Sequence, residues 1–210
     1  MLNVLARARI SRVLDPIGAR LARAGVSPDV ITVLGTVGVV TVSLVFVARG
    51  HLLLGAIGVT VFALTDMLDG AIARARGTTS RWGAFLDSTM DRLADGAAFG
   101  SLAFWLATSG RKSEAAAAFC CLIAGVIVSY AKARAEGLGM TANVGIAERT
   151  ERLLIGGFGA ILEVIGVPHG LEVVLWLLTA LTVFTIYQRF RVIWQQSREP
   201  AATNDSAGRA

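Results

Sequence analysis

The chain has 210 residues, of which 54% are hydrophobic and only 17% are charged, and its mean hydropathy is +0.63. Ordinary globular chains carry about 25% charged residues, so this composition excludes a soluble α/β enzyme and indicates an integral membrane protein. The two cysteines, Cys120 and Cys121, are adjacent in an apolar run and make a poor pair, which excludes a disulfide scaffold. The net charge of +5 on so apolar a chain points to a membrane surface rather than to nucleic acid.

An amphipathic segment opens the chain. Over residues 1–26 apolar positions alternate with arginines, and no continuous apolar core precedes a cleavage site, so the segment is unlike a signal peptide. The pattern predicts an amphipathic juxtamembrane helix that lies on anionic lipid headgroups. Ser27 and Pro28 then supply an N-cap and a first-turn proline for the next helix.

Six apolar stretches follow along the chain. They are residues 30–48, 52–65, 96–110, 115–131, 153–167 and 173–188. The first is close to the roughly 20 residues that cross the hydrocarbon core, and the shorter ones can continue through charged flanks, to Arg74 in the second and back to Gly83 in the third. The pattern predicts an all-α integral membrane protein with six transmembrane helices in one domain, residues 27–197, followed by a disordered polar tail, residues 198–210.

The basic residues predict the orientation. With six spans both termini lie on one side, and that side would hold all of the 20 Lys and Arg residues except Arg49, Arg111 and Lys112. Because Lys and Arg collect at the cytoplasmic ends of membrane helices, this asymmetry predicts a multi-pass protein of the plasma membrane with both termini in the cytoplasm.

Aspartates are concentrated around one turn of the chain. They are Asp66, Asp69, Asp87, Asp91 and Asp95. The first two are three residues apart and the others are four apart, and these spacings place each set on one helical face. Ionised carboxylates in membrane helices are costly, and so many close together repel unless a cation neutralises them. All-oxygen ligation suits Mg²⁺ or Mn²⁺, and two ions would account for four ligating aspartates.

Two other interpretations of these carboxylates remain open. The aspartates can pair at the membrane interface with the nearby arginines, which are Arg74, Arg76, Arg81 and Arg92. They can also form a divalent-cation or proton pathway, since chains of acidic residues mark transporters. A pathway predicts acids spread through the depth of the membrane. These acids cluster at one end, which favours a site open to the cytoplasm.

The same segment carries a specific motif. Residues 66–91 read D-x2-D-G-x2-A-R-x8-G-x3-D-x3-D. This resembles, without a departure, the signature of the CDP-alcohol phosphotransferases, which displace CMP from a CDP-linked alcohol. The resemblance implies that residues 27–197 form a catalytic domain and that Asp91 takes the proton from the attacking hydroxyl. It also implies four metal ligands: Asp66, Asp69, Asp87 and Asp91.

The resemblance further implies a binding site for CDP-diacylglycerol. Its residues would be Asp29, Val30, Ile31, Thr32, Gly70, Arg74 and Ser80. Gly70 would let the nucleotide approach the backbone, and Arg74 would offer a planar fork of donors to a phosphate. Taken alone, residues 29–32 are only a capped helix start and Gly70 only a packing position.

A second basic group would bind the acceptor alcohol. Its members end or begin three predicted helices on the cytoplasmic side: Lys132, Arg134, Arg149, Arg152 and Arg189. Each alone is an interfacial anchor, but together they can form a phosphate pocket. The surrounding patterns S-Y-x-K-x-R, E-R-x-E-R and Q-R resemble the phosphatidylinositol phosphate synthases of actinobacteria, a branch of this family. That resemblance assigns Lys132, Arg134, Arg152 and Arg189 to an inositol phosphate.

The implied reaction joins inositol 1-phosphate to the phosphatidyl group of CDP-diacylglycerol, giving phosphatidylinositol phosphate and CMP. The family's habit also implies a homodimer in the bilayer. Glycerol 3-phosphate is the nearest alternative acceptor, and it would make the protein a phosphatidylglycerophosphate synthase. From another class, the alternative is a divalent-cation or proton transporter, which would move ions without releasing CMP.

Overall fold

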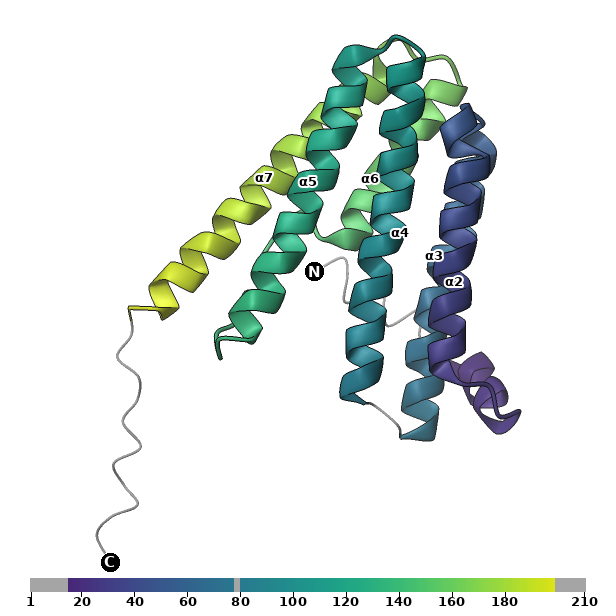
Figure 1. Ribbon diagram of the computed structural model, residues 1–210, viewed down its shortest axis with the longest axis vertical. Helices are drawn as coiled ribbons and strands as arrows, with labels where there is room; N and C mark the ends of the chain where they lie inside the picture. Colours follow the sequence, from purple (N-terminus) through teal and green to yellow (C-terminus); the bar gives the residue numbers. More distant parts are fainter. Residues whose placement is uncertain (1–14, 78–79, 199–210) are drawn as a thin grey trace, which may run out of the picture.

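The computed structural model describes residues 15–77 and 80–198, apart from the side chains of Asp66 and Met67. Within these ranges the chain is helical and has no strands (Figure 1). Residues 15–23 form a helical segment. The elements that follow are α2 (Pro28–Val45), the 3-10 turn η1 (Val47–Arg49), α3 (Leu52–Arg76), α4 (Arg81–Thr108), α5 (Lys112–Glu136), α6 (Arg149–Val164) and α7 (Gly170–Gln196). The predicted extensions of the second and third helices through their charged flanks are therefore confirmed.

Local sequence explains the helix ends nearest to the aspartates. Pro28 occupies the first turn of α2, where its missing N–H is not needed. Helix α3 ends at Gly77, whose φ of 63° is left-handed and suits glycine. The Ser80 hydroxyl caps α4 by accepting a hydrogen bond from the Gly83 N–H at 2.9 Å. The chain thus reverses between α3 and α4, and we call this end of the molecule the signature end.

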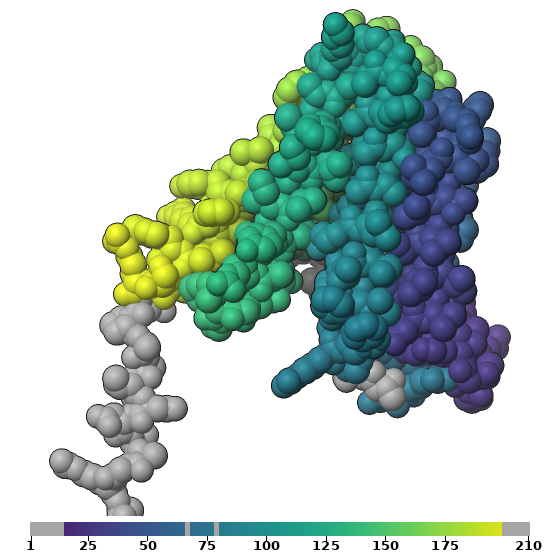
Figure 2. Space-filling view, in the orientation of Figure 1, coloured from purple at the N-terminus to yellow at the C-terminus, as the bar shows by residue number. Residues whose placement is uncertain are grey.

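The helices form two groups that meet at the end opposite to the signature end. Helix α2 packs against both α3 and α4, α4 packs against α5, and α5 packs along α7. Figure 1 shows α5 and α7 diverging from α2, α3 and α4 toward the signature end. In the space-filling view a notch separates the lower parts of α4 and α5 (Figure 2). The two groups are therefore joined at one end and spread apart at the other.

The joined end is closed by an apolar cluster and an ion cluster. The apolar cluster contains Val47, Leu52, Leu102, Ala103, Leu106, Ala117, Ala118, Leu171 and Leu175. Arg111, at the start of α5, contacts both carboxylate oxygens of Glu163 on α6, at 2.5 and 2.9 Å, and Glu114 at 2.9 Å. The bidentate hydrogen bond to Glu163 raises the pKa of Arg111, so this cation stays charged. Trp105 lies under its guanidinium, 5.6 Å from ring centre to Cζ.

In the part of the chain that the structure describes, four helices are long and apolar enough to cross a membrane: Pro28–Arg49, Leu52–Arg76, Lys112–Glu136 and Gly170–Gln196. Large apolar side chains such as Leu34, Leu44 and Ile57 lie exposed on their surfaces, as expected of a protein whose surroundings are lipid. The predicted third and fifth spans correspond to α4, which is charged over its first half, and to α6, which has only 16 residues. The fold is thus that of an all-helical membrane protein.

Two predicted segments fall partly outside the described residues. These are residues 1–14 of the amphipathic helix and residues 199–210 of the polar tail. The described segment, residues 15–23, packs on the last turns of α3, where a Cβ on Gly18 would come within 2.7 Å of the Ala71 side chain. Arg76 donates a hydrogen bond to the Ala22 carbonyl at 3.2 Å. This segment therefore covers the end of α3 that carries the signature.

Candidate active site

The signature residue Asp69 is tied to the start of the first span. Asp69 is buried on α3 and accepts hydrogen bonds from the hydroxyl of Thr32 and from the N–H of Gly70. Thr32 lies on α2 and is also buried. Because a buried polar group without a partner costs about 1–3 kcal/mol, this pairing helps to fix α2 on α3. A predicted nucleotide contact and a predicted metal ligand are thereby brought together.

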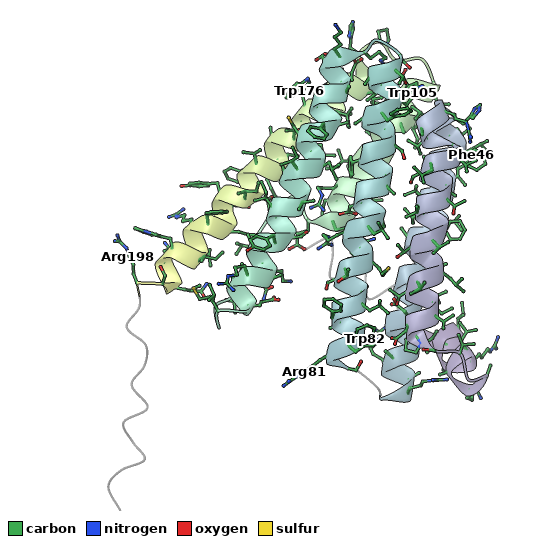
Figure 3. The ribbon with its side chains drawn as sticks, in the orientation of Figure 1. Phe46, Arg81, Trp82, Trp105, Trp176 and Arg198 are labelled. Carbon is green, nitrogen blue, oxygen red and sulfur yellow. The ribbon has the colours of Figure 1, made fainter. Side chains whose placement is uncertain are left out.

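The start of α2 also lies beside the start of α4. Asp29 accepts a hydrogen bond from the Trp82 indole N–H at 3.1 Å, and a Cβ on Gly83 would lie 3.9 Å from an Asp29 oxygen. Figure 3 shows Trp82 at the lower end of the bundle, whereas Arg81 points away from it. Three predicted nucleotide contacts, Asp29, Thr32 and the cap Ser80, therefore gather at the signature end. Val30 is exposed and Ile31 is half-buried on the same turn.

Gly70 and Arg74 lie one turn apart on α3. A Cβ on Gly70 would come within 3.3 Å of an Arg74 guanidinium nitrogen, so the absence of a side chain leaves room for Arg74. Arg74 is exposed and pairs with Asp15 of the preceding helical segment at 3.1 Å. Both groups are more than half exposed, so the pair contributes little to stability and leaves the guanidinium accessible to a ligand.

The two remaining signature aspartates lie on α4. Asp87 is exposed. The side chain of Asp91 is only 15% exposed, and its two oxygens lie 2.6 Å from Arg149 and 3.3 Å from Arg92. Arg149 is the first residue of α6, so Asp91 connects the signature helix to the part of the chain predicted to bind the acceptor.

A divalent metal fits the chemistry of these donors. Asp66 and Asp69 are one turn apart on α3, Asp87 and Asp91 are one turn apart on α4, and both helices pack on α2. Carboxylate oxygens are the ligands of hard cations such as Mg²⁺ and Mn²⁺. Among the side chains that the structure describes, no three of the Asp, Glu, His and Cys type gather closely enough to hold a metal. The side chain of Asp66 lies outside that description.

A buried ion pair lies next to the signature. Arg152 on α6 is 2% exposed, and its guanidinium lies 2.8 Å from Asp95 on α4, which is also buried. The other oxygen of Asp95 lies 3.3 Å from Arg149. Asp95 belongs to the group of aspartates noted in the sequence, where no role was predicted for it. Its position four residues after Asp91 was the only signal of this pairing.

The other predicted acceptor cations differ in exposure. Arg189 on α7 is buried and donates to the carbonyls of Val128 at 2.6 Å and Val144 at 2.9 Å, and it lies 3.3 Å from Glu148. It therefore joins α7 to α5 and to the α5–α6 connection. Lys132 is half-exposed, 3.9 Å from Glu136. Arg134 is exposed, and its side chain makes no hydrogen bond or ion pair with the described residues.

Comparison with known protein families identifies the family of this chain. Residues 25–187 match the model of the CDP-alcohol phosphatidyltransferase family. Because this match covers most of the chain, the chain belongs to that family. The family predicted from the motif is confirmed.

Relatives and solved structures agree with this assignment. The phosphatidylinositol phosphate synthase of Streptomyces avermitilis is 46% identical over 222 residues, covering 99% of this chain and 90% of that protein. The synthase of Mycobacterium tuberculosis is 42% identical, covering 92% and 91%. Its crystal structure with CDP-DAG bound has a TM-score of 0.82 and covers 87% of this chain and 94% of that chain. Its complex with manganese and citrate has a TM-score of 0.81, covering 86% and 88%.

Proposed function

We propose that this chain is a phosphatidylinositol phosphate synthase. It transfers the phosphatidyl group of CDP-diacylglycerol to inositol 1-phosphate and releases CMP. The observation that carries this proposal is the likeness to synthases of that name over nearly the whole chain, including the half beyond the signature. Glycerol 3-phosphate is the acceptor that the experiment below distinguishes from inositol phosphate.

The donor lipid would bind at the signature end. The residues proposed for it are Asp29, Val30, Ile31, Thr32, Gly70, Arg74 and Ser80. The convergence of Asp29, Thr32 and Ser80 from α2 and α4 supports this assignment. The accessible guanidinium of Arg74 would pair with a phosphate of the donor, releasing its weak contact with Asp15.

Asp66, Asp69, Asp87 and Asp91 would hold Mg²⁺ or Mn²⁺, and we propose two ions. A bound divalent metal would stabilise the negative charge on the attacking and leaving oxygens of the displacement at phosphorus. The manganese complex of the Mycobacterium tuberculosis synthase supports a divalent ion in the family. The chain's own contribution is to orient the carboxylates, as Thr32 does for Asp69.

Asp91 is the proposed general base, which accepts the proton of the attacking inositol hydroxyl. A carboxylate is a weak base, so its contribution depends on being held close to the hydroxyl in the right direction. Its contacts with Arg92 and Arg149 restrict the rotation of its side chain. This restriction of the Asp91 carboxylate supports its assignment as the base.

The acceptor phosphate is assigned to Lys132, Arg134, Arg152 and Arg189. Lys132 and Arg134 are the accessible members and can approach a phosphate directly. Arg152 and Arg189 are buried against carboxylates and carbonyls, so each would exchange one of these contacts to bind a phosphate directly. Arg149, 23% exposed beside Asp91, is a further cation within this group.

We further propose six transmembrane helices, with α4 and α6 as the third and fifth. The signature end would face the cytoplasm of the plasma membrane, together with both termini, and two copies would form a homodimer. Residues 1–26 would lie on the membrane surface and residues 198–210 would form a polar tail. The distribution of Lys and Arg supports this orientation.

The test is a CMP-release assay on the purified protein with CDP-diacylglycerol. Inositol 1-phosphate, free inositol and glycerol 3-phosphate would be compared as acceptors, with Mg²⁺, with Mn²⁺ and with a chelator. We expect CMP only with a divalent metal, and fastest with inositol 1-phosphate. Faster release with glycerol 3-phosphate would make the protein a phosphatidylglycerophosphate synthase. Ion flux into vesicles without CMP release would indicate a transporter.

A further inference from the structure

Asp95 lies one helical turn beyond the last residue of the signature and contacts two arginines of another helix. One of its oxygens lies 2.8 Å from Arg152 and the other lies 3.3 Å from Arg149. Both arginines belong to α6, whereas Asp95 belongs to α4. A single carboxylate thus joins the signature helix to the helix that carries the acceptor-side cations.

The environment of this carboxylate makes the contact strong. Asp95 is 6% exposed and Arg152 is 2% exposed. A narrow space beside them has no room for a water molecule, and its lining includes Phe99, Cys121 and Gly125. In such dry surroundings a charge requires its partner, and removing either one leaves an uncompensated ion.

A third helix contributes to the position of Arg152. Gly125 on α5 lies against the guanidinium, and a Cβ there would come within 3.1 Å of Nε. Arg152 also donates to the Ala147 carbonyl at 3.4 Å. Arg152 is therefore in contact with α4 through Asp95, with α5 through Gly125 and with the α5–α6 connection through Ala147, so it can fix the position of Asp95 in return.

Arg149 connects Asp95 to the proposed base, Asp91. Its Nε faces Asp95, and one of its terminal nitrogens lies 2.6 Å from Asp91. The guanidinium is planar, so fixing Nε on one carboxylate fixes the direction in which the terminal nitrogens point. Asp95 and Asp91 are four residues apart on α4 and are spanned by this one side chain.

We propose that Asp95 is a positioning residue for the acceptor side of the site: anchored by Arg152, it holds Arg149 beside Asp91, where the phosphorylated acceptor must bring its hydroxyl. The proposal rests on the proposed function. Displacing a group by about 1 Å in such a site can lower kcat/KM for the acceptor on the order of 10²-fold, so a residue that never touches the substrate can still matter.

The primary test compares Asp95→Asn with wild type in the CMP-release assay. Asn keeps the shape of Asp but removes the charge that attracts both arginines. We expect the apparent KM for inositol 1-phosphate to rise at least about tenfold and the apparent KM for CDP-diacylglycerol to stay within about twofold. A purely structural role would reduce the active fraction, and hence kcat, without changing either KM.

The matched control is Glu114→Gln. Glu114 is a buried carboxylate that pairs with Arg111 at 2.9 Å at the opposite end of the bundle. The control variant should lower thermal stability as Asp95→Asn does, with no change in either KM. An acceptor KM that rises as much in the control would overturn the positioning role.

A second variant leaves the buried pair intact. In Arg149→Lys the positive charge remains, but a single ammonium cannot span Asp91 and Asp95 as the guanidinium does. We expect its acceptor KM to rise also. If Asp95 acts through Arg149, then adding Asp95→Asn to Arg149→Lys should raise the acceptor KM by much less than in the wild-type background. Full additivity would overturn the proposal, and so would an unchanged KM in Arg149→Lys.

The two proposals fail in different ways. If the wild-type protein prefers another acceptor or releases no CMP, then the proposed function fails, and Asp95 loses its assigned role with it. If the wild-type protein uses inositol 1-phosphate and Asp95→Asn keeps its acceptor KM, then only the positioning role fails. If Asp95→Asn does not fold, the acceptor KM of Arg149→Lys tests the positioning role: a raised KM supports it and an unchanged KM overturns it.

Discussion

At the scale of single residues, the polar groups of the signature end are connected by short contacts between helices. Thr32 on α2 donates to Asp69 on α3, while Arg149 on α6 reaches Asp91 on α4. Each contact crosses from one helix to another, so the orientation of each carboxylate is set by a residue outside the signature. Substituting a signature carboxylate should therefore affect turnover directly, whereas substituting its partner should act through the orientation of that carboxylate.

Asp91→Asn should nearly abolish turnover while the protein still folds. Asn is close to Asp in shape but cannot accept the proton of the attacking hydroxyl. Positioned proton transfer typically contributes about 10²–10⁴-fold, so we expect a loss of that size in kcat of the CMP-release assay. The matched control is Glu172→Gln, the same chemical change near the opposite end, which should retain activity. Turnover of Asp91→Asn within about tenfold of wild type would remove Asp91 from the role of base.

Thr32→Val should weaken the signature end through Asp69. Val has the shape of Thr without the hydroxyl, so buried Asp69 loses a donor, at a cost of about 1–3 kcal/mol in the free energy of unfolding. We expect a lower thermal midpoint and a higher apparent KM for CDP-diacylglycerol. Thr32→Ser keeps the hydroxyl and should stay close to wild type in donor KM. Equal behaviour of the Val and Ser variants would contradict the role given to this hydrogen bond.

At the scale of helices, α4 is acidic toward its N-terminus and apolar toward its C-terminus. Its N-terminal part carries Asp87, Asp91 and Asp95, and its C-terminal part contributes Leu102 and Leu106 to the apolar core at the opposite end. One helix therefore takes part in both the polar site and the closed end of the bundle. Because α4 and α5 are joined at the closed end, contacts there determine how the two groups of helices meet.

Arg111→Gln should loosen the closed end. Its bidentate pairing with Glu163 and its contact with Glu114 would be lost, leaving both carboxylates without their cation. Breaking a fully buried pair costs about 3–5 kcal/mol; Arg111 and Glu163 are about a quarter exposed, so we expect ~2 kcal/mol in the free energy of unfolding. The adjacent exposed residue provides a control, and Lys112→Gln should have little effect. Equal thermal midpoints for the two variants would show that the ion cluster does not hold this end together.

At the scale of the whole molecule, the structure joins a closed end to an open, charged end. Apolar side chains lie exposed on the outer surfaces of the membrane helices. Away from the closed end, Asp91 and Asp95 on α4 pair with Arg149 and Arg152 on α6. This arrangement suits a reaction between a lipid and a water-soluble polyol phosphate, since the lipid can stay in the bilayer while the polyol enters from water. The proposed orientation places that end on the cytoplasmic side.

Single cysteines should report this orientation. Cys120 and Cys121 would first be replaced by Ala, and then Lys112→Cys or Arg198→Cys introduced at opposite ends of the bundle. In intact cells a membrane-impermeant maleimide should label Lys112→Cys, whereas Arg198→Cys should react only after the cells are permeabilised. The reverse pattern would invert the topology. Labelling of both cysteines in intact cells would contradict an orientation with the C-terminus inside.

The sequence alone determined the class of protein, the continuation of two helices through the charged signature and the family. The reason is that these properties are encoded locally. Apolar composition selects the membrane, Ser27 and Pro28 mark where a helix begins, and the motif of residues 66–91 has a fixed spacing. None of them requires knowledge of which helix lies beside which.

The tertiary structure decided which charges have partners and which are accessible. From sequence, Arg152 and Arg134 were equivalent candidates for the acceptor phosphate, but Arg152 is buried against Asp95 and Arg134 is exposed. Arg189 proved to donate to carbonyls of the α5 region. Helical periodicity states which residues share a face of one helix, but not which face of another helix it meets. Burial and partner choice follow from that long-range packing, and so they appear only when the helices are assembled.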